Sequence, residues 1–301
     1  MEEALRRVRL ALASVSQMEV PEKMTLREIG DIVVRSHSPD EKASWTCAAY
    51  EKFCVEKSGL VLGPSINIGR GERPTIAGLQ VVAPGRMPSI GKGGSPRSRA
   101  MMLHALVHVE LAAVDLSWDI LLRDWGHTLE EAFYLDWLTV AFEECKHYLV
   151  LRQRLKELGH DYGSFPVHDS IWDDALKTKD SLVERLVLEH CTHEARGVDT
   201  CVLSTIPRLR KGGDDASADI LEFVVLLDEV DHIRKGLSYF KLVAGRAGAG
   251  EAEHIAAFRE VQRRVFAGGH SKGPFAVDLR AAAGFTSAWY EAQEAVVDVA
   301  L

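Results

Sequence analysis

Apolar residues recur at intervals of three and four along most of this chain, which is the period of an α-helix that buries one face. The strict alternation typical of β-strands is weak almost everywhere. We therefore expect an all-α protein. The predicted helices cover residues 3–18, 26–36, 40–58, 99–122, 129–158, 180–208, 216–244, 252–267 and 277–298.

Glycine and proline interrupt this pattern most strongly between residues 60 and 96, where eight glycines fall. A loop of this length in a compact domain is usually functional or packs as an extended arm, so we expect a lid or a pocket wall here. The pattern predicts one globular unit in three parts. They are N-terminal helices and the long loop over 1–98, a four-helix bundle over 99–245, and C-terminal helices over 246–301.

Two predicted helices of the bundle carry the same motif, an acidic residue followed by Glu-x-x-His. Positions i and i+3 of an α-helix share a face, so each of these glutamates points the same way as its histidine. A carboxylate and an imidazole that point together are typical ligands of a transition metal. The residues are Glu143, Glu144 and His147 in the first helix, and Asp228, Glu229 and His232 in the second.

A further glutamate precedes each motif by about one helical hairpin. Glu110 lies 34 residues before Glu144, and Glu194 lies 35 residues before Glu229. The midpoint of each pair falls in a glycine-containing turn sequence, as expected for a hairpin. Residues equidistant from the turn of an antiparallel hairpin lie level, so both pairs are predicted to lie at one height in the bundle.

Four helices that each turn a glutamate inward, two of them with Glu-x-x-His, form the di-iron or di-manganese centre of ferritin-like bundles. We therefore expect two iron ions, or one manganese and one iron. By symmetry, Glu144 and Glu229 would bridge the two metals, whereas Glu110 and Glu194 would each bind one. The six predicted ligands are Glu110, Glu144, His147, Glu194, Glu229 and His232.

The acids just before the two central glutamates have two interpretations. Glu143 and Asp228 are either surface charges or acceptors for the free N–H of a ligand histidine on the opposite helix. His190 lies four residues before Glu194 and shares its face, so it is either an extra ligand or a core histidine.

His104 and His108 are four residues apart and suggest a second metal site at first sight. However, His108 lies about 200° around the helix from Glu110, at about 100° per residue. We therefore interpret both as packing histidines that form hydrogen bonds.

The motif sequences together resemble the ferritin-like family catalogued as domain of unknown function 455, over roughly residues 30 to 245. The resemblance implies a di-metal bundle and supplies no substrate; the characterised relatives nearest to it are tRNA-modifying di-iron hydroxylases. One departure is the run Glu189-His190-Cys191-Thr192-His193, where the family pattern has aliphatic residues and proline. The runs that carry the resemblance are 103–110, 136–141, 162–163, 167–169, 194–199 and 228–232.

The composition argues against nucleic-acid-binding, membrane-spanning and secreted proteins. Hydrophobic residues make up 47% and charged residues 27% of the 301 residues, as in an ordinary globular protein. The net charge of −8 argues against a nucleic-acid partner, and no apolar run reaches a membrane-spanning length. The acidic N-terminus lacks a secretory signal, and five cysteines suggest reduced thiols, so we expect a cytoplasmic protein. The basic amphipathic stretch over 6–17 leaves mitochondrial import as the alternative.

Oxygen-rich ligation with one histidine per metal favours iron or manganese over copper or zinc. We therefore expect an oxidase or hydroxylase that uses dioxygen as co-substrate on a small organic molecule. The alternatives are a tRNA-modifying hydroxylase acting on a modified nucleoside, a ferroxidase, and a non-catalytic bundle stabilised by metal. A catalytic site needs a pocket, whereas a structural metal site is closed. The apolar C-terminal helix packs either on the bundle or on a partner, which would allow a homodimer.

Overall fold

The computed structural model describes residues 1–66, 68, 76–245 and 248–291, and over these residues the chain is all-helical, as predicted. The described residues contain no strand, only one parallel β-bridge between Val81 and Val167. The α-helices are α1 (Glu2–Ala13), α2 (Leu26–Arg35), α3 (Pro39–Tyr50), α4 (Pro96–Leu122), α5 (Glu131–Glu157), α6 (Ser170–Lys177), α7 (Leu182–Val187), α8 (Glu194–Thr200), α9 (Ile206–Lys211), α10 (Asp215–Ile220), α11 (Leu226–Ala244), α12 (Glu251–Val265), α13 (Val277–Ala282) and α14 (Ser287–Tyr290). The π-helical segments are η1 (Glu51–Val55), η3 (Leu188–His193), η4 (Cys201–Thr205) and η5 (Leu221–Val225), and η2 (Pro84–Arg86) is a 3₁₀ turn.

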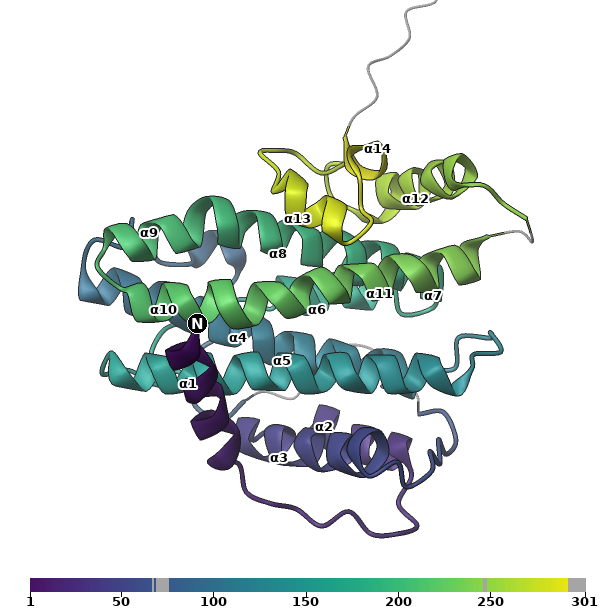
Figure 1. The fold of residues 1–301 in the computed structure, drawn as a ribbon, viewed down its shortest axis with the longest axis horizontal. Coiled ribbons are helices and arrows are strands. Elements are labelled where there is room, and N and C mark those ends of the chain that lie inside the picture. The colour runs from purple at the N-terminus through teal and green to yellow at the C-terminus, as the bar shows by residue number, and fades with distance from the viewer. Residues whose placement is uncertain (67, 69–75, 246–247, 292–301) are drawn as a thin grey trace, which may run out of the picture.

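Four long helical segments form the middle of the molecule (Figure 1). Two are the single helices α4 and α5, which pack on each other along their length. The third runs without a break from α7 through α9, and the fourth runs from α10 through α11. Helices α2 and α3 cover α4 and α5 on one side of the bundle, whereas α12 packs on α7 at the other side and α13 packs on α11.

Both hairpins turn where the sequence predicted them to turn. The connection between α4 and α5 contains Gly126 at a φ of +67°, and Asp124 accepts a hydrogen bond from the Gly126 amide. The connection between α9 and α10 contains Gly213 at a φ of +76°, and Asp214 then caps α10. A positive φ is readily adopted only by glycine, so these two residues fix where each hairpin reverses.

The structure differs from the predicted helices in three places. Helix α1 ends at Ala13, and the crossover between the hairpins contains the unpredicted helix α6. The helix expected over 277–298 is interrupted at Gly284, which has a φ of +81° between α13 and α14. Residues 292–298 of that expectation lie outside the described residues.

The long loop is held against the bundle at several points in its described part. Val167 donates to the Gln80 carbonyl and accepts from the Val82 amide, which ties the loop to the crossover. The buried Arg27 guanidinium donates to the carbonyls of Gly63 and Leu121, which joins the start of the loop to the end of α4.

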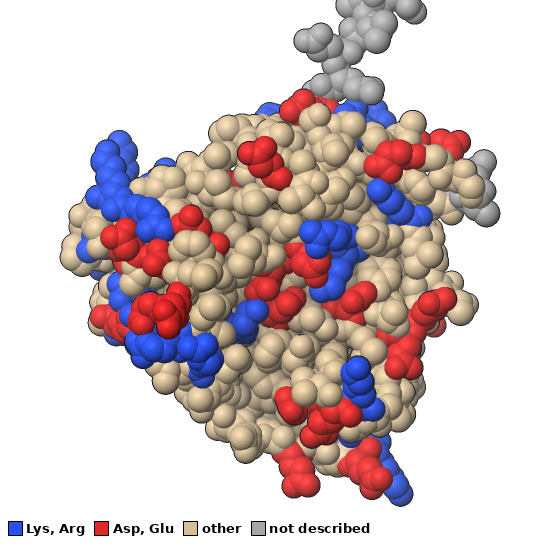
Figure 2. Space-filling view, viewed as in Figure 1, with Lys and Arg blue, Asp and Glu red and all other residues tan. Residues whose placement is uncertain are grey.

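Lys and Arg are interspersed with Asp and Glu on the face drawn in Figure 2, rather than gathered into one patch. None of the helices in the described ranges is long and apolar enough to cross a membrane. All five cysteines are free thiols.

Candidate metal centre

The six predicted ligands meet in the middle of the bundle, although they come from four helical segments. Five of them are buried, and Glu194 is half-buried. Helix α4 supplies Glu110, α5 supplies Glu144 and His147, α8 supplies Glu194, and α11 supplies Glu229 and His232.

These side chains form two overlapping groups, in each of which one ligand atom per residue lies within 4.8 Å of all the others. Glu144 and Glu229 belong to both groups. The two shared residues are those to which symmetry assigned the bridging role. The first group is Glu110, Glu144, His147 and Glu229; the second is Glu144, Glu194, Glu229 and His232.

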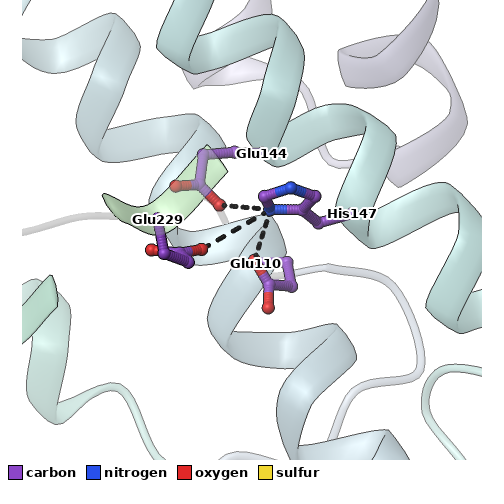
Figure 3. A group of neighbouring side chains, drawn as sticks. All are labelled: Glu110, Glu144, His147 and Glu229. Carbon is purple, nitrogen blue, oxygen red and sulfur yellow. Dashed lines mark ion pairs between the residues drawn. The ribbon is translucent and has the colours of Figure 1, made fainter. Parts of the chain in front are cut away.

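In the first group, three carboxylates converge on one nitrogen of His147 (Figure 3). The Nδ1 atom lies 3.4 Å from Glu110 Oε2, 3.5 Å from Glu144 Oε2 and 3.5 Å from Glu229 Oε1. A small cation among these atoms would have one nitrogen and three oxygen donors around it.

In the second group, the other oxygens of the shared glutamates face His232. Its Nδ1 atom lies 3.0 Å from Glu144 Oε1 and 3.8 Å from Glu229 Oε2. Each of the two glutamates therefore turns one oxygen toward His147 and the other toward His232. This is the disposition that a bridging carboxylate requires.

The outer nitrogen of each imidazole contacts an acid on the opposite helix. His147 Nε2 lies 2.8 Å from Asp228 Oδ2, and His232 Nε2 lies 3.0 Å from Glu143 Oε2. Of the two interpretations of Glu143 and Asp228 from the sequence, these contacts favour hydrogen bonds to a histidine of the opposite helix over surface charge. A histidine that donates its Nε2–H to a carboxylate keeps the Nδ1 lone pair for a metal, and the hydrogen bond fixes the ring orientation.

Four buried atoms of the cluster have no hydrogen-bond partner among the described residues: both carboxylate oxygens of Glu144 and the Nδ1 atoms of His147 and His232. Buried polar atoms are almost always satisfied, because burying them unpaired is costly. The orphaned atoms are those that point into the two groups. The residues present therefore fit divalent cations.

The pKa shifts within the cluster also favour a bound cation. Burial raises the pKa of Glu110 and of Glu194 well above the usual value of a glutamate, and neighbouring carboxylates add to this. Burial would lower the pKa of His147, but its hydrogen bond to Asp228 and the nearby carboxylates of Glu110 and Glu144 raise it well above its usual value. Protons thus neutralise the cluster when no cation does, and a bound metal would displace them.

A cavity of about 110 Å³ borders all four glutamates of the cluster. Its wall also contains Glu189 and His190 from η3. His190 joins neither group of potential ligands, and its ring lies against Trp137 with the centroids 4.1 Å apart. Burial raises the pKa of Glu189 to about 7. Glu189 belongs to the run that departs from the family pattern, but no role was predicted for it. The signal was a charged residue among Leu186, Val187, Leu188 and Cys191.

His104 and His108 form hydrogen bonds away from the cluster, as interpreted from the sequence. His108 Nδ1 lies 2.7 Å from the Tyr162 hydroxyl, and His104 Nε2 accepts from the Gly163 amide at 2.9 Å. They border a second cavity of about 70 Å³, whose wall includes Met87 from the long loop.

The two cavities are neighbours, because Val109 and Ile171 line both. The described part of the loop borders this second cavity and not the one beside the glutamates. Its role as a lid stays a prediction.

Comparison with known proteins gives a family but no activity. The model of a family described as "Protein of unknown function (DUF455)" matches residues 35–291. A Haemophilus influenzae protein described as "Uncharacterized protein" is 34% identical over 193 residues, which cover 62% of this chain and 65% of that protein. The chain thus spans less than two thirds of that relative's length. No solved structure matches this chain.

Proposed function

This chain belongs to the DUF455 family of proteins of unknown function. We propose that it is a di-metal carboxylate protein that activates dioxygen to oxidise or hydroxylate a small organic molecule. In this proposal, residues 99–245 are a ferritin-like four-helix bundle and the six clustered side chains hold the metals. The family description names no activity, so the proposal depends on the site itself.

The ligand pattern supports a pair of metals. Two helical segments each contribute one glutamate and two contribute Glu-x-x-His, which is the ligand set of ferritin-like di-metal bundles. Four carboxylates and two imidazoles favour iron or manganese. Two such ions, each changing its oxidation state by one electron, supply the two-electron chemistry that dioxygen reduction needs.

The observation that carries the catalytic part of the proposal is the cavity beside the cluster. A structural metal site is closed on all sides by protein ligands, whereas a catalytic site leaves room for a substrate next to the metal. Here the cavity borders Glu110, Glu144, Glu194 and Glu229 together, so a small molecule in it would contact the cluster.

The chain's own residues would bind and orient the metals and keep the site dry. Asp228 and Glu143 hold the two imidazoles in register by their hydrogen bonds. Apolar side chains such as Leu106, Val225 and Leu226 line the cavity and limit the entry of water. An apolar, water-poor site protects reactive species from side reactions.

Dioxygen uptake tests the proposal. Protein loaded anaerobically with ferrous iron is mixed with a known amount of dioxygen, and consumption is followed with an oxygen electrode. We expect uptake of dioxygen in proportion to bound iron, and none with Glu144→Ala/Glu229→Ala. Glu131→Ala, an exposed position on the same helix as Glu144, is the matched control and should behave as wild type. Iron-loaded wild type that consumes no dioxygen would refute the proposal and favour a metal-stabilised bundle.

A further inference from the structure

Two buried polar side chains in the cavity have no part in the cluster. Glu189 and His190 are 3% and 2% exposed. Both carboxylate oxygens of Glu189 and both ring nitrogens of His190 lack a hydrogen-bond partner in the part of the chain that the structure describes. Such groups are rarely left unsatisfied, so four orphaned atoms on two residues that line one cavity indicate a ligand.

The neighbouring charges do not satisfy Glu189, because they are engaged elsewhere. The guanidinium of Arg185 donates to Asp119 at 2.6 Å and to the Ala175 carbonyl at 2.7 Å. His193 lies 3.1 Å from Asp174. Glu189 and His190 also fall outside both groups of potential metal ligands.

The backbone presents these two side chains in an unusual way. Both lie in the π-helical segment η3, which runs directly into Glu194 at the start of α8. Wide π-helical turns are frequent at functional sites, and they aim side chains differently from a regular helix. Gly236 of α11 permits the close contact, since a Cβ there would lie 2.4 Å from the His190 carbonyl oxygen.

The rest of the cavity wall away from the glutamates is mainly apolar and sets the size of an occupant. A dry apolar cavity of roughly 150 Å³ holds one benzene molecule. The volume here is about 110 Å³, which corresponds to about four to five non-hydrogen atoms on the same scale. The apolar lining includes Leu106, Val109, Leu116, Ile171, Val198 and Leu221.

We infer that this cavity binds a small molecule with a short apolar body and one polar head, a hydroxyl or an amine. The head donates a hydrogen bond to Glu189 and forms a second hydrogen bond with His190. The apolar body then lies between Glu189 and the metal-binding glutamates, which line the same cavity. That this molecule is the substrate rests on the proposed function. Its binding rests only on the cavity and on the orphaned polar atoms.

The test uses three probes of five non-hydrogen atoms: 1-butanol, n-butylamine and 1-chlorobutane, which has no donor. Dissociation constants are measured by NMR titration of the ¹⁵N-labelled full-length protein loaded with diamagnetic zinc. We expect wild type to bind 1-butanol or n-butylamine more tightly than 1-chlorobutane. At a pH above the native pKa of Glu189, which is about 7, Glu189→Leu should weaken the donor probe at least about tenfold, because a hydrogen bond to a charged group is lost. Its affinity for 1-chlorobutane should be unchanged or higher.

Two further variants make the result specific. Glu189→Gln keeps an acceptor but removes the charge, so it should retain 1-butanol binding and lose n-butylamine binding. Glu184→Leu is the control: Glu184 lies on the adjoining helix α7, accepts from Arg264 and does not line the cavity. It should change no dissociation constant. Equal affinities for all three probes, insensitivity to Glu189→Leu, or no binding of any probe would overturn the inference.

Metal measurements on the same samples separate this inference from the proposed function. Replacing zinc by paramagnetic manganese should accelerate relaxation of the bound probe's protons, because the cavity borders the metal-binding glutamates. Binding that depends on Glu189 in protein that takes up no metal would support the cavity and contradict the di-metal function. Metal uptake without probe binding would overturn only the inference drawn here.

Discussion

His147 on α5 contacts Asp228 on α11 through its Nε2 atom at 2.8 Å, although the two residues lie 81 positions apart in the sequence. The contact is reciprocated, because His232 on α11 lies 3.0 Å from Glu143 on α5. Both imidazoles are thereby held with Nδ1 toward the carboxylate cluster. The acid that precedes each ligand glutamate thus orients the histidine of the other motif.

This exchange predicts a loss of metal affinity when either acid is neutralised. Asp228→Asn and Glu143→Gln should each weaken metal binding about 10- to 100-fold, as outer partners of ligand histidines generally do. Competition with a chromophoric chelator measures the affinity for manganese or zinc. Asp231→Asn, on the same helix but paired with Lys235 at the surface, is the control. Affinities equal to that control would show that the two acids are surface charges.

Metal should also stabilise the fold. A cation that binds only the native state at about 1,000 times its dissociation constant adds about 4 kcal/mol to the free energy of unfolding. Urea unfolding of wild type with and without manganese measures this gain. Glu144→Ala/Glu229→Ala should unfold at the same urea concentration in both conditions. A wild type insensitive to manganese, or a variant that still responds, would contradict the assignment of ligands.

The close approach of α11 to η3 predicts opposite effects at two helical glycines. Gly236→Ala should destabilise the protein by about 1–3 kcal/mol through overpacking, since its Cβ would lie 2.4 Å from the His190 carbonyl oxygen. Gly197→Ala on α8 meets nothing within 4 Å and should be neutral or stabilise by up to about 1 kcal/mol. Chemical denaturation of both variants checks the contrast. If Gly236→Ala leaves the free energy of unfolding unchanged, the prediction is wrong and η3 shifts away from α11 at little cost.

A buried ion pair near the end of α4 predicts a pH-dependent difference in stability. Burial would raise the pKa of Asp119, but Arg185 and Arg123 hold it below its usual value. The pair therefore stabilises the fold above the unfolded pKa of aspartate, about 3.9, and this contribution is lost as the pH falls through the lower native value. Asp119→Asn should cost about 3–5 kcal/mol at pH 7. Urea unfolding should show the gap to wild type narrowing below about pH 4; a constant gap would contradict the assignment.

The clustering of the six candidate ligands could be predicted from the sequence, because the distance of a residue from the turn of an antiparallel hairpin sets its height in the bundle. Glu110 and Glu144 lie level for this reason, as do Glu194 and Glu229. Helical periodicity also placed the four central segments, since each buries one face over many turns.

The π-helical segment and the cavity wall could not be predicted from helical periodicity. A single wide turn hardly changes the spacing of apolar residues, so the sequence of η3 predicts an ordinary α-helix. In the structure this segment places Glu189 and His190 in the cavity wall. Cavity walls depend on packing between segments far apart in the chain, as when Leu106 and Leu221 meet around one space. By contrast, the break at Gly284 was readable, because a glycine before Phe285 and Thr286 signals a helix end.

Metal content tests the central claim most directly. Wild type and Glu144→Ala/Glu229→Ala are purified from cells supplied with iron and manganese and analysed by mass spectrometry for metal per chain. The two overlapping ligand groups predict about two iron or manganese ions per wild-type chain, in keeping with a carboxylate-bridged pair, and their loss in the variant. Wild type that holds no metal, even after anaerobic reconstitution with ferrous iron, would contradict the account.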